Sequence, residues 1–251
     1  MTNLDCTLNG VSLSGIYERI CILDIIEDAP RMHETTLALH TGVQRVLARE
    51  RQSISIRVRF AIHEERPAMR CFILQQIHDW AQQNGYLTLT ARPGQQLHVR
   101  CTGLPNLSGN DWTEELSLIF TSTHSPYWED YTVTSAQGTA PVTVNVPGTA
   151  PSTPVEVILL NATAATVTQV TVTCGESHIT FRDIALPSGG QLVISQVDGI
   201  FTAKLDGSSI LHRRTMDSAD ALLVPCGKAV TMSVTASQAL FAFYHVRGRY
   251  L

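Results

Sequence analysis

The chain has 251 residues, enough for one large domain or two ordinary ones at a prior of about 150 residues per domain. Hydrophobic residues make up 44% and charged residues 16%, which argues against intrinsic disorder, since disorder combines low hydrophobicity with high net charge. The 18 Lys and Arg against 22 Asp and Glu give a net charge of -4, which argues against a protein that holds nucleic acid by neutralising its phosphates.

The N-terminus carries no positive cluster followed by an apolar run, and no 18 consecutive residues are apolar. We therefore expect neither a secretion signal nor a membrane span. Six cysteines lie far apart without a C-x-x-C pair, as in a protein made in a reducing compartment, and we expect free thiols throughout. They are Cys6, Cys21, Cys71, Cys101, Cys174 and Cys226.

The stretch from Glu27 to Gln52 shows no core-facing period, and its polar residues carry both signs of charge. A segment of about 25 residues without such a period is long for a compact domain and is commonly functional or bound to a partner. We expect a projecting hairpin or arm, with a mobile solvated loop as the alternative.

The next segment alternates at period two, which predicts a half-buried strand with a basic outer face. Its apolar positions are Ile54, Ile56, Val58 and Phe60, and its polar positions are Ser53, Ser55, Arg57 and Arg59.

A helix is predicted to begin at Pro67, with Glu64 and Glu65 near the positive end of its dipole. Gly85 is the expected C-terminal stop. One apolar stripe runs along the predicted helix at Met69, Ile73, Ile77 and Trp80.

Two further strands should follow, joined by a turn at residues 91–94, because Leu87 and Leu89 precede that turn and Leu97, Val99 and Cys101 return from it. Alternation at Leu116, Leu118 and Phe120 predicts another strand.

Composition changes near residue 126. Residues 1–125 hold eleven of the sixteen arginines, whereas residues 132–173 contain thirteen Ser and Thr and no Lys or Arg. We predict two domains, 1–125 and 126–251, with the junction at Pro126, Tyr127 and Trp128, where a proline ends a strand and two aromatic rings can pin the boundary.

The second half consists of predicted strands, which indicates a β-sandwich or jelly roll. Asp198-Gly199 and Asp206-Gly207 are two turn signals within it. The strands are expected at 142–146, 155–160, 167–174, 178–181, 191–197, 200–205, 228–235 and 240–246. The fold class is therefore mainly β, with an N-terminal β-sandwich that packs one α-helix and a C-terminal all-β sandwich.

The sequence contains no motif that predicts catalysis or a cofactor, so we expect a protein that is not an enzyme. His63, His78 and Cys71 are scattered along the sequence. Residues scattered in this way more often belong to the core or the surface than to a zinc site. The carboxylate pairs Glu64-Glu65 and Glu114-Glu115 are adjacent, so in extended structure they point to opposite faces and cannot flank one bond. We predict no catalytic, metal or cofactor site.

Asn106 and Asn161 match the N-x-S/T signal for glycosylation, but without a signal sequence these matches mean little. Arg247 and Arg249 are two basic residues near the end of the sequence, too few to predict a nucleic-acid site. A carbohydrate-binding module that acts through the C-terminal sandwich is the alternative function. It would need exposed aromatic rings, and aromatic residues make up only 6% of the chain.

Several segments resemble, in order and spacing, the belt domain of the distal tail proteins of phages with long non-contractile tails. In the first half they are "NGVSLSG", "SISIRVRFAI", "RPAMRCFILQQIHDWAQQNG", "LTLTARPGQQLHVRC" and "LSLIFTSTHSPYWED". In the second half, "GTAPSTPVEVILLN", "VDGIFTAKLDG" and "LVPCGKAVTMSV" resemble the galectin-like sandwich that follows the belt domain in that family.

The resemblance implies a virion structural protein whose belt domains close into a hexameric ring at the tip of the tail tube, after assembly in the host cytoplasm. Such a ring joins the tube protein to the tail-tip or receptor-binding proteins and leaves a channel through which DNA passes, without a membrane partner. A ring subunit must bury unlike surfaces head to tail. The arm at Glu27–Gln52 and the edge of the strand Ser53–Phe60 are the candidate surfaces. Five arginines could bridge subunits or line the bore, or could simply be exposed to solvent on a face of the sheet. They are Arg45, Arg49, Arg51, Arg57 and Arg59.

Overall fold

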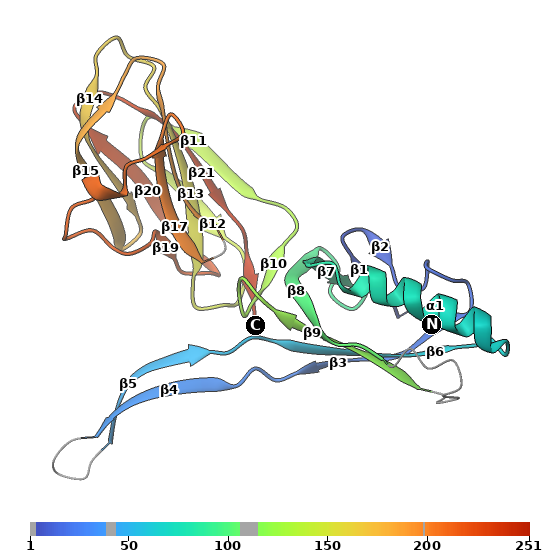
Figure 1. Ribbon diagram of the computed structural model, residues 1–251. Coiled ribbons are helices and arrows are strands. Elements are labelled where there is room, and N and C mark those ends of the chain that lie inside the picture. Colours follow the sequence, from blue (N-terminus) through green and yellow to red (C-terminus); the bar gives the residue numbers. More distant parts are fainter. Residues whose placement is uncertain (1–3, 39–43, 106–114, 198) are drawn as a thin grey trace. The chain divides into compact units, whose positions relative to one another are not determined.

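The structure is a computed structural model that describes residues 4–38, 44–105, 115–197 and 199–251; the side chains of residues 37–49 and 197 are outside this description. The chain divides into two compact units, Met1–Trp128 and Glu129–Leu251. Both are built almost wholly of antiparallel strands, with a single α-helix in the described residues (Figure 1), so the predicted mainly-β class is confirmed.

The first unit is a twisted sheet with the strand order β2-β1-β7-β8-β9-β6-β3 and one helix packed on it (Figure 1). Its elements are β1 (Cys6–Leu8), β2 (Val11–Ser12), β3 (Ile20–Asp28), β4 (Met32–Ala38), β5 (Gln44–Arg51), β6 (Ser55–Ile62), α1 (Pro67–Ala81), β7 (Gly85–Leu89), β8 (Gln95–Gly103) and β9 (Leu116–Ser122). β10 (Trp128–Asp130) begins at the last residue of this unit.

Strand β6 confirms the predicted alternation, because the side chains of Ile56, Val58 and Phe60 are fully buried while Arg57 is exposed. The buried side faces helix α1: Trp80 packs edge-to-face on Phe120 of β9, with ring centroids 5.9 Å apart. We call the opposite side of the sheet the outer face.

Helix α1 begins at Pro67, as predicted, and buries Ile73, Leu74, Ile77 and Trp80, whereas Met69 is only partly buried. The prediction that Gly85 stops the helix is wrong. The helix ends at Ala81, and Gly85 is the first residue of β7. A Cβ at Gly85 would overlap the side chain of Asn9, so close packing against another segment explains the glycine.

The expected edge at Ser53–Phe60 is also wrong, because β6 is paired on both sides, with β9 through Val58–Leu118 and with β3 through Val58–Ile25. The edge strand is β3, which sequence reasoning did not single out. Within the described residues β3 pairs only with β6.

The segment after β3 forms the expected projecting hairpin. Strands β4 and β5 pair antiparallel from Met32–Arg51 at the base to Ala38–Gln44, and they form a two-stranded sheet of their own (Figure 1). We call this hairpin the arm.

The second unit is a sandwich of two antiparallel sheets, ordered β11-β21-β13-β16-β17-β18 and β12-β20-β14-β15, with β19 paired to β13. Its strands are β11 (Thr134–Gly138), β12 (Val142–Val146), β13 (Thr153–Leu160), β14 (Val167–Cys174), β15 (Ser177–Leu186), β16 (Gln191–Val197), β17 (Ile200–Leu205), β18 (Ser208–Ser209), β19 (Leu223–Val224), β20 (Lys228–Ala236), β21 (Phe241–Val246) and β22 (Arg249–Tyr250), with a short 3-10 turn η1 (Leu211–Arg213). Each of the eight predicted strands is present, whereas β11 and the short β18, β19 and β22 were missed.

The core of this sandwich is formed by alternate residues of both sheets, among them Val157, Val172, Phe181 and Tyr244, all at most 1% exposed. The turn at Asp206-Gly207 has positive φ at both residues (45° and 86°) and joins β17 to β18, as the Asp-Gly signal predicts. Asp198, in the other predicted turn, lies outside the described residues.

Candidate assembly surface

Strand β3 is a long edge strand of the sheet in the first unit, and it carries exposed apolar side chains. Leu23 is 44% exposed and Ile26 is 37% exposed. Cys21, near the start of the strand, is exposed as well. The strand is nine residues long and contains neither proline nor lysine, the residues with which proteins usually blunt such edges. Its one irregularity is a bulge between Ile22 and Asp24.

Two of the predicted arginines, Arg57 and Arg59, lie two positions apart on β6 and on the outer face of the sheet. Arg59 sits between Asp24 and Ser117, and it forms ion pairs with Glu115 and, at 4.0 Å, with Asp24. The Glu115 carboxylate raises the pKa of the Arg59 guanidinium through a hydrogen bond and its charge. Arg59 is therefore neutralised within its own subunit.

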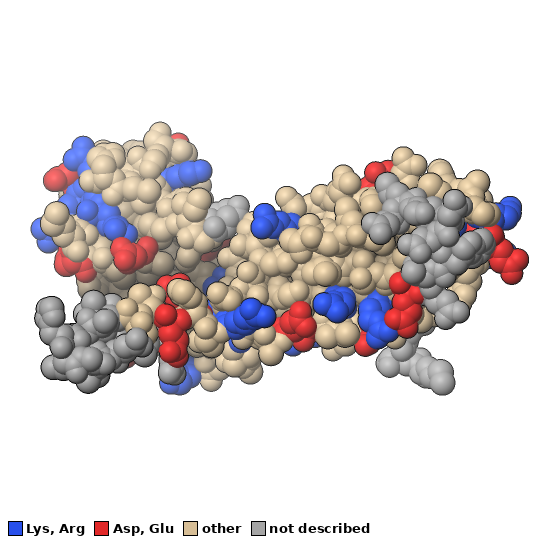
Figure 2. All heavy atoms as spheres, turned by 60° about the horizontal axis from the view of Figure 1, so that its bottom comes forward, with Lys and Arg blue, Asp and Glu red and all other residues tan. Residues whose placement is uncertain are grey.

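Arg57 differs, because it lies between Ile26 and Ile119 and makes no side-chain hydrogen bond or ion pair with any described residue. Seen from the underside of Figure 1, Lys and Arg are interspersed with Asp and Glu and do not form one continuous basic patch (Figure 2). Such a mixed surface does not attract the DNA backbone strongly, since binding needs clustered cations.

The other three predicted arginines lie in β5 of the arm. Arg45 and Arg49 pair in register with Leu37 and Glu34, but their side chains are outside the described part of the chain. Arg51 is half-buried at the base of the arm, with its guanidinium 5.2 Å from the ring centre of Tyr127. The structure therefore does not gather the five arginines at one place.

Two of the three residues predicted for the domain junction, Tyr127 and Trp128, contact the root of the arm, whereas Pro126 precedes them in the chain. The Trp128 ring is fully buried, carries the Arg92 guanidinium 5.1 Å above its centre, and donates a hydrogen bond from Nε1 to Glu27 Oε1. Arg92 in turn forms an ion pair of 2.9 Å with Glu27. These three residues, which we call the root clamp, connect the end of β3, the turn between β7 and β8, and the last residue of the unit.

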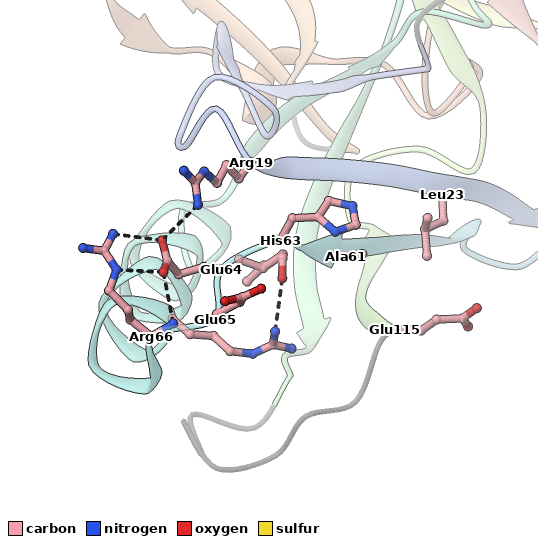
Figure 3. Close-up of a pocket in the computed structure, with 10 residues that line it drawn as sticks. Arg19, Leu23, Ala61, His63, Glu64, Glu65, Arg66 and Glu115 are labelled. Carbon is pink, nitrogen blue, oxygen red and sulfur yellow. Dashed lines mark hydrogen bonds and ion pairs between the residues drawn. The ribbon is translucent and has the colours of Figure 1, made fainter.

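A cavity of about 1130 Å³ opens between the start of β3, the end of β6 and the beginning of α1. Figure 3 shows the guanidinium groups of Arg19 and Arg66 converging on the Glu64 carboxylate. The lining residues include three arginines and three glutamates, so their charges balance. This balance favours neither an anion nor a cation as a ligand.

Glu64 itself is a buried structural carboxylate. It accepts hydrogen bonds from the side chain and backbone N–H of Arg66, at 2.9 and 3.0 Å, and from the Tyr17 hydroxyl at 3.1 Å. The bonds from Arg66 are the main reason why the pKa of Glu64 is lowered to about 2. Sequence reasoning placed this carboxylate near the helix dipole, and its partners became visible only in the fold.

The described residues contain no group of three or more His, Cys, Asp or Glu side chains placed to hold a metal ion, and no helix among them is long and apolar enough to span a membrane. The six cysteines, all within the described residues, form no disulfide. Asn161, which matches a glycosylation signal, is fully buried, and its amide donates hydrogen bonds to the carbonyls of Ala165, Leu186 and Pro187.

The sequence matches no protein-family model and no curated protein. Its fold is similar to the crystal structure of the SPP1 Dit (gp 19.1) protein, described as a paradigm of the hub adsorption apparatus in phages that infect Gram-positive bacteria. The TM-score is 0.70 at 11% identity, and the match covers 97% of this chain and 98% of that one.

Two chains of the phage P2 baseplate in its activated conformation give lower TM-scores. The form with Ca gives 0.46 at 8% identity, over 92% of this chain and 90% of that one; the form with Sr gives 0.44 at 9% identity, over 97% of each chain. The match to the SPP1 Dit protein shows that the chain shares that fold over nearly its whole length, and it confirms, at the level of the fold, the resemblance predicted from sequence.

Proposed function

We propose that this chain is a structural subunit of a phage tail, six copies of which close through their first units into a ring hub at the distal end of the tail tube. The ring joins the tube to the tail-tip or receptor-binding proteins and leaves a central channel for DNA. The observation that carries this proposal is the likeness to the SPP1 Dit protein, because it extends over both units and not over one common β-sandwich alone.

The surface of the first unit supports the same function. A ring needs two unlike surfaces on each subunit, and the long free edge of β3 and the arm provide two candidates. On the outer face, the Arg59 charge is neutralised by Glu115 and Asp24, which suits a surface past which DNA must slide without binding.

Electron microscopy and native mass spectrometry of the full chain, alone and mixed with the tail tube protein of the same phage, test the proposal. We expect closed rings with an open centre and a mass of six subunits, either in solution or at the ends of tubes. Monomers in both settings would contradict the proposal. Closed rings of another copy number would retain the hub and correct the hexamer.

The second unit offers less support for a carbohydrate-binding module. Phe241 and Phe243 pack edge-to-face on the outward side of β21, with ring centroids 5.0 Å apart. Their cross-strand neighbours are the aliphatic Leu160 and Ile158 on β13, and Gln137 lies opposite Phe243 on β11. A sugar site needs several convergent polar groups, and one amide beside two aliphatic side chains does not supply them, so this face favours the structural role. Specific binding on a glycan array, abolished by Phe243→Ala, would restore the carbohydrate alternative.

A further inference from the structure

The connection between the two units contains no spare chain. Trp128, the last residue of the first unit, is held there by the root clamp, and the next residue, Glu129, belongs to the second unit. The Glu129 carboxylate accepts a hydrogen bond of 2.9 Å from Nε of Arg249 and forms an ion pair of 2.8 Å with Nη2 of the same side chain. One peptide bond therefore separates a residue fixed in the first unit from a residue fixed in the second.

Residues 129–131, which we call the entry segment, are held in the second unit by residues 247–250, which we call the strap. The Asp130 backbone N–H donates to the Gly248 carbonyl at 2.9 Å. The Tyr250 hydroxyl donates to the Asp130 carboxylate at 3.1 Å. Backbone and side chain of the entry segment are therefore both bound to the strap.

The strap makes all the hydrogen bonds and ion pairs that hold the entry segment within the described residues of the second unit. Besides the bonds above, Arg247 donates from Nη1 to the carbonyls of Asp130 and Tyr131, at 3.0 and 2.8 Å. The side chains that follow add little, since Tyr131 and Val133 are 56% and 39% exposed. Strand pairing resumes at Thr134, the first residue of β11.

The strap is fastened separately to the body of the second unit. The Arg249 carbonyl accepts hydrogen bonds from the backbone N–H groups of Thr149 and Ala150, at 2.8 and 2.9 Å. The Thr153 hydroxyl donates to the Arg247 carbonyl at 2.7 Å. Because these bonds do not involve the entry segment, the entry segment can detach while the strap stays in place.

The contacts between the entry segment and the strap are polar and lie near the surface. The side chains of Arg249 and Glu129 are 20% and 22% exposed, and Arg247 and Tyr250 are only partly buried. Segments with few buried apolar contacts open at a lower free energy than the core of a domain. We therefore expect the entry segment to open before the sandwich unfolds.

We propose that the strap sets the length of the connection between the two units. While the entry segment is bound to the strap, the connection is one peptide bond. When the entry segment detaches, residues 129–133 join the connection and lengthen it by up to roughly 15 Å, at about 3.3–3.6 Å per extended residue. This inference goes beyond the proposed function, because it concerns each single chain and holds whether or not copies close into a ring.

Hydrogen exchange of the full chain, followed by NMR, tests this opening. Three amides report on three parts of the second unit: Asp130 between the entry segment and the strap, Ala150 between the strap and the body, and Val172 in a central strand of the sandwich. We expect the Asp130 amide to exchange about tenfold faster than the other two, or more. Equal rates would overturn the inference, because the entry segment would then detach only when the whole unit unfolds.

A charge substitution tests the role of the strap directly. Arg249→Ala removes the charged partner of Glu129 and should speed exchange at Asp130 by about another tenfold, with the rate at Val172 unchanged. Arg213→Ala is the matched control, since Arg213 is exposed and makes no side-chain hydrogen bond or ion pair with any described residue. If Arg249→Ala leaves the Asp130 rate at the wild-type value, the inference is wrong.

A second substitution acts by shape and not by charge. A Cβ at Gly248 would overlap the Asp130 carboxylate, so Gly248→Ala should keep the entry segment detached and remove the protection of the Asp130 amide. Circular dichroism and the exchange rate at Val172 verify that the sandwich is folded. If this variant does not fold, the wild-type rates and Arg249→Ala decide the question.

Limited digestion with chymotrypsin measures the freed chain itself. Chymotrypsin cleaves after tyrosine, and cleavage after Tyr131 requires a detached, extended segment, so its rate follows the fraction of open molecules. We expect Arg249→Ala to be cleaved there about tenfold faster than the wild type, and Arg213→Ala at the wild-type rate. Faster exchange at Asp130 without faster cleavage would also overturn the inference, because the segment would loosen without lengthening the connection.

Discussion

The indole Nε1 of Trp128 donates a 3.1 Å hydrogen bond to Oε1 of Glu27, and so connects the last residue of the first unit with the end of the free edge strand. Arg92 completes this root clamp from the turn between β7 and β8, with its guanidinium over the Trp128 ring and paired with the other oxygen of Glu27. The arm therefore begins from a fixed base.

Loss of Arg92 should weaken this base measurably. In Arg92→Ala, Glu27 retains Trp128 but loses its ion-pair partner in a site where both side chains are less than a third exposed. We expect the free energy of unfolding to fall by about 1–3 kcal/mol, measured by urea denaturation. Arg57→Ala is the control: Arg57 is exposed, and its removal should change the free energy by about 0.5 kcal/mol or less. Equal effects of the two substitutions would disprove the role of the clamp.

The carboxylate of Glu64 should make the stability of the first unit pH-dependent. Its pKa is about 2 in the folded chain against an ordinary value of 4.5, so the ionised form stabilises the fold. This contribution is complete above pH 5 and is lost as the pH falls from about 5 towards 2. Glu64→Gln should therefore be less stable than the wild type at pH 7, and the difference should shrink towards pH 3.

Glu65→Gln provides the control for this measurement, because Glu65 is the exposed neighbour in the chain. Urea denaturation at a series of pH values compares the three proteins. A stability difference for Glu64→Gln that stays constant between pH 7 and pH 3 would show that the carboxylate charge is not the cause.

Gly85 should resist substitution because of a neighbour far away in sequence. A Cβ at this position overlaps the side chain of Asn9, whose Oδ1 accepts a hydrogen bond from the Tyr86 backbone N–H. We expect Gly85→Ala to cost about 1–3 kcal/mol of stability by overpacking. Gly15→Ala, whose Cβ would make only ordinary contacts, should be close to neutral.

A second substitution distinguishes this clash from a general loss of backbone freedom. Asn9 has a positive φ of 51°, which glycine adopts readily, so Asn9→Gly removes the obstructing side chain without backbone strain. Thermal unfolding of the double variant should recover part of the stability lost in Gly85→Ala. No recovery would refute the clash.

The amide of Asn161 should be essential to the second unit. Its Nδ2 donates to three carbonyl oxygens at 2.8 to 3.1 Å while the residue is fully buried. Asn161→Asp replaces this donor by an oxygen that repels the same carbonyls, and we expect a loss of about 3 kcal/mol or more. Asn145→Asp, on the exposed side of β12, should have little effect in the same denaturation experiment. A small loss at position 161 would contradict the importance of this network.

Much of the fold could be predicted from local patterns. The alternation in Ile56, Val58 and Phe60 predicted a half-buried strand, and the proline at position 67 marked the start of the helix. Both features are periodic or positional, so they depend on residues close together in the chain. The lack of a core-facing period after Glu27 likewise predicted the arm, since a segment without such a face cannot pack into a core.

The candidate site was harder to predict. Sequence reasoning chose the edge of β6, but β6 lies between β3 and β9, and no local signal states which strands will flank a given strand. It also treated Arg57 and Arg59 alike, whereas only Arg59 meets Glu115, 56 residues further along the chain.

The sequence by itself determined many of the strands, where the helix begins, and that a charged arm leaves the sheet, because hydrophobic period and backbone preference act over a few residues. Only the tertiary structure decided that β3 is left with a free edge, that Glu64 is held ionised by Arg66 and Tyr17, and that Gly85 is required by Asn9. Those outcomes depend on pairing between distant segments, whose register is set by the packing of the whole sheet and not by any one stretch of residues.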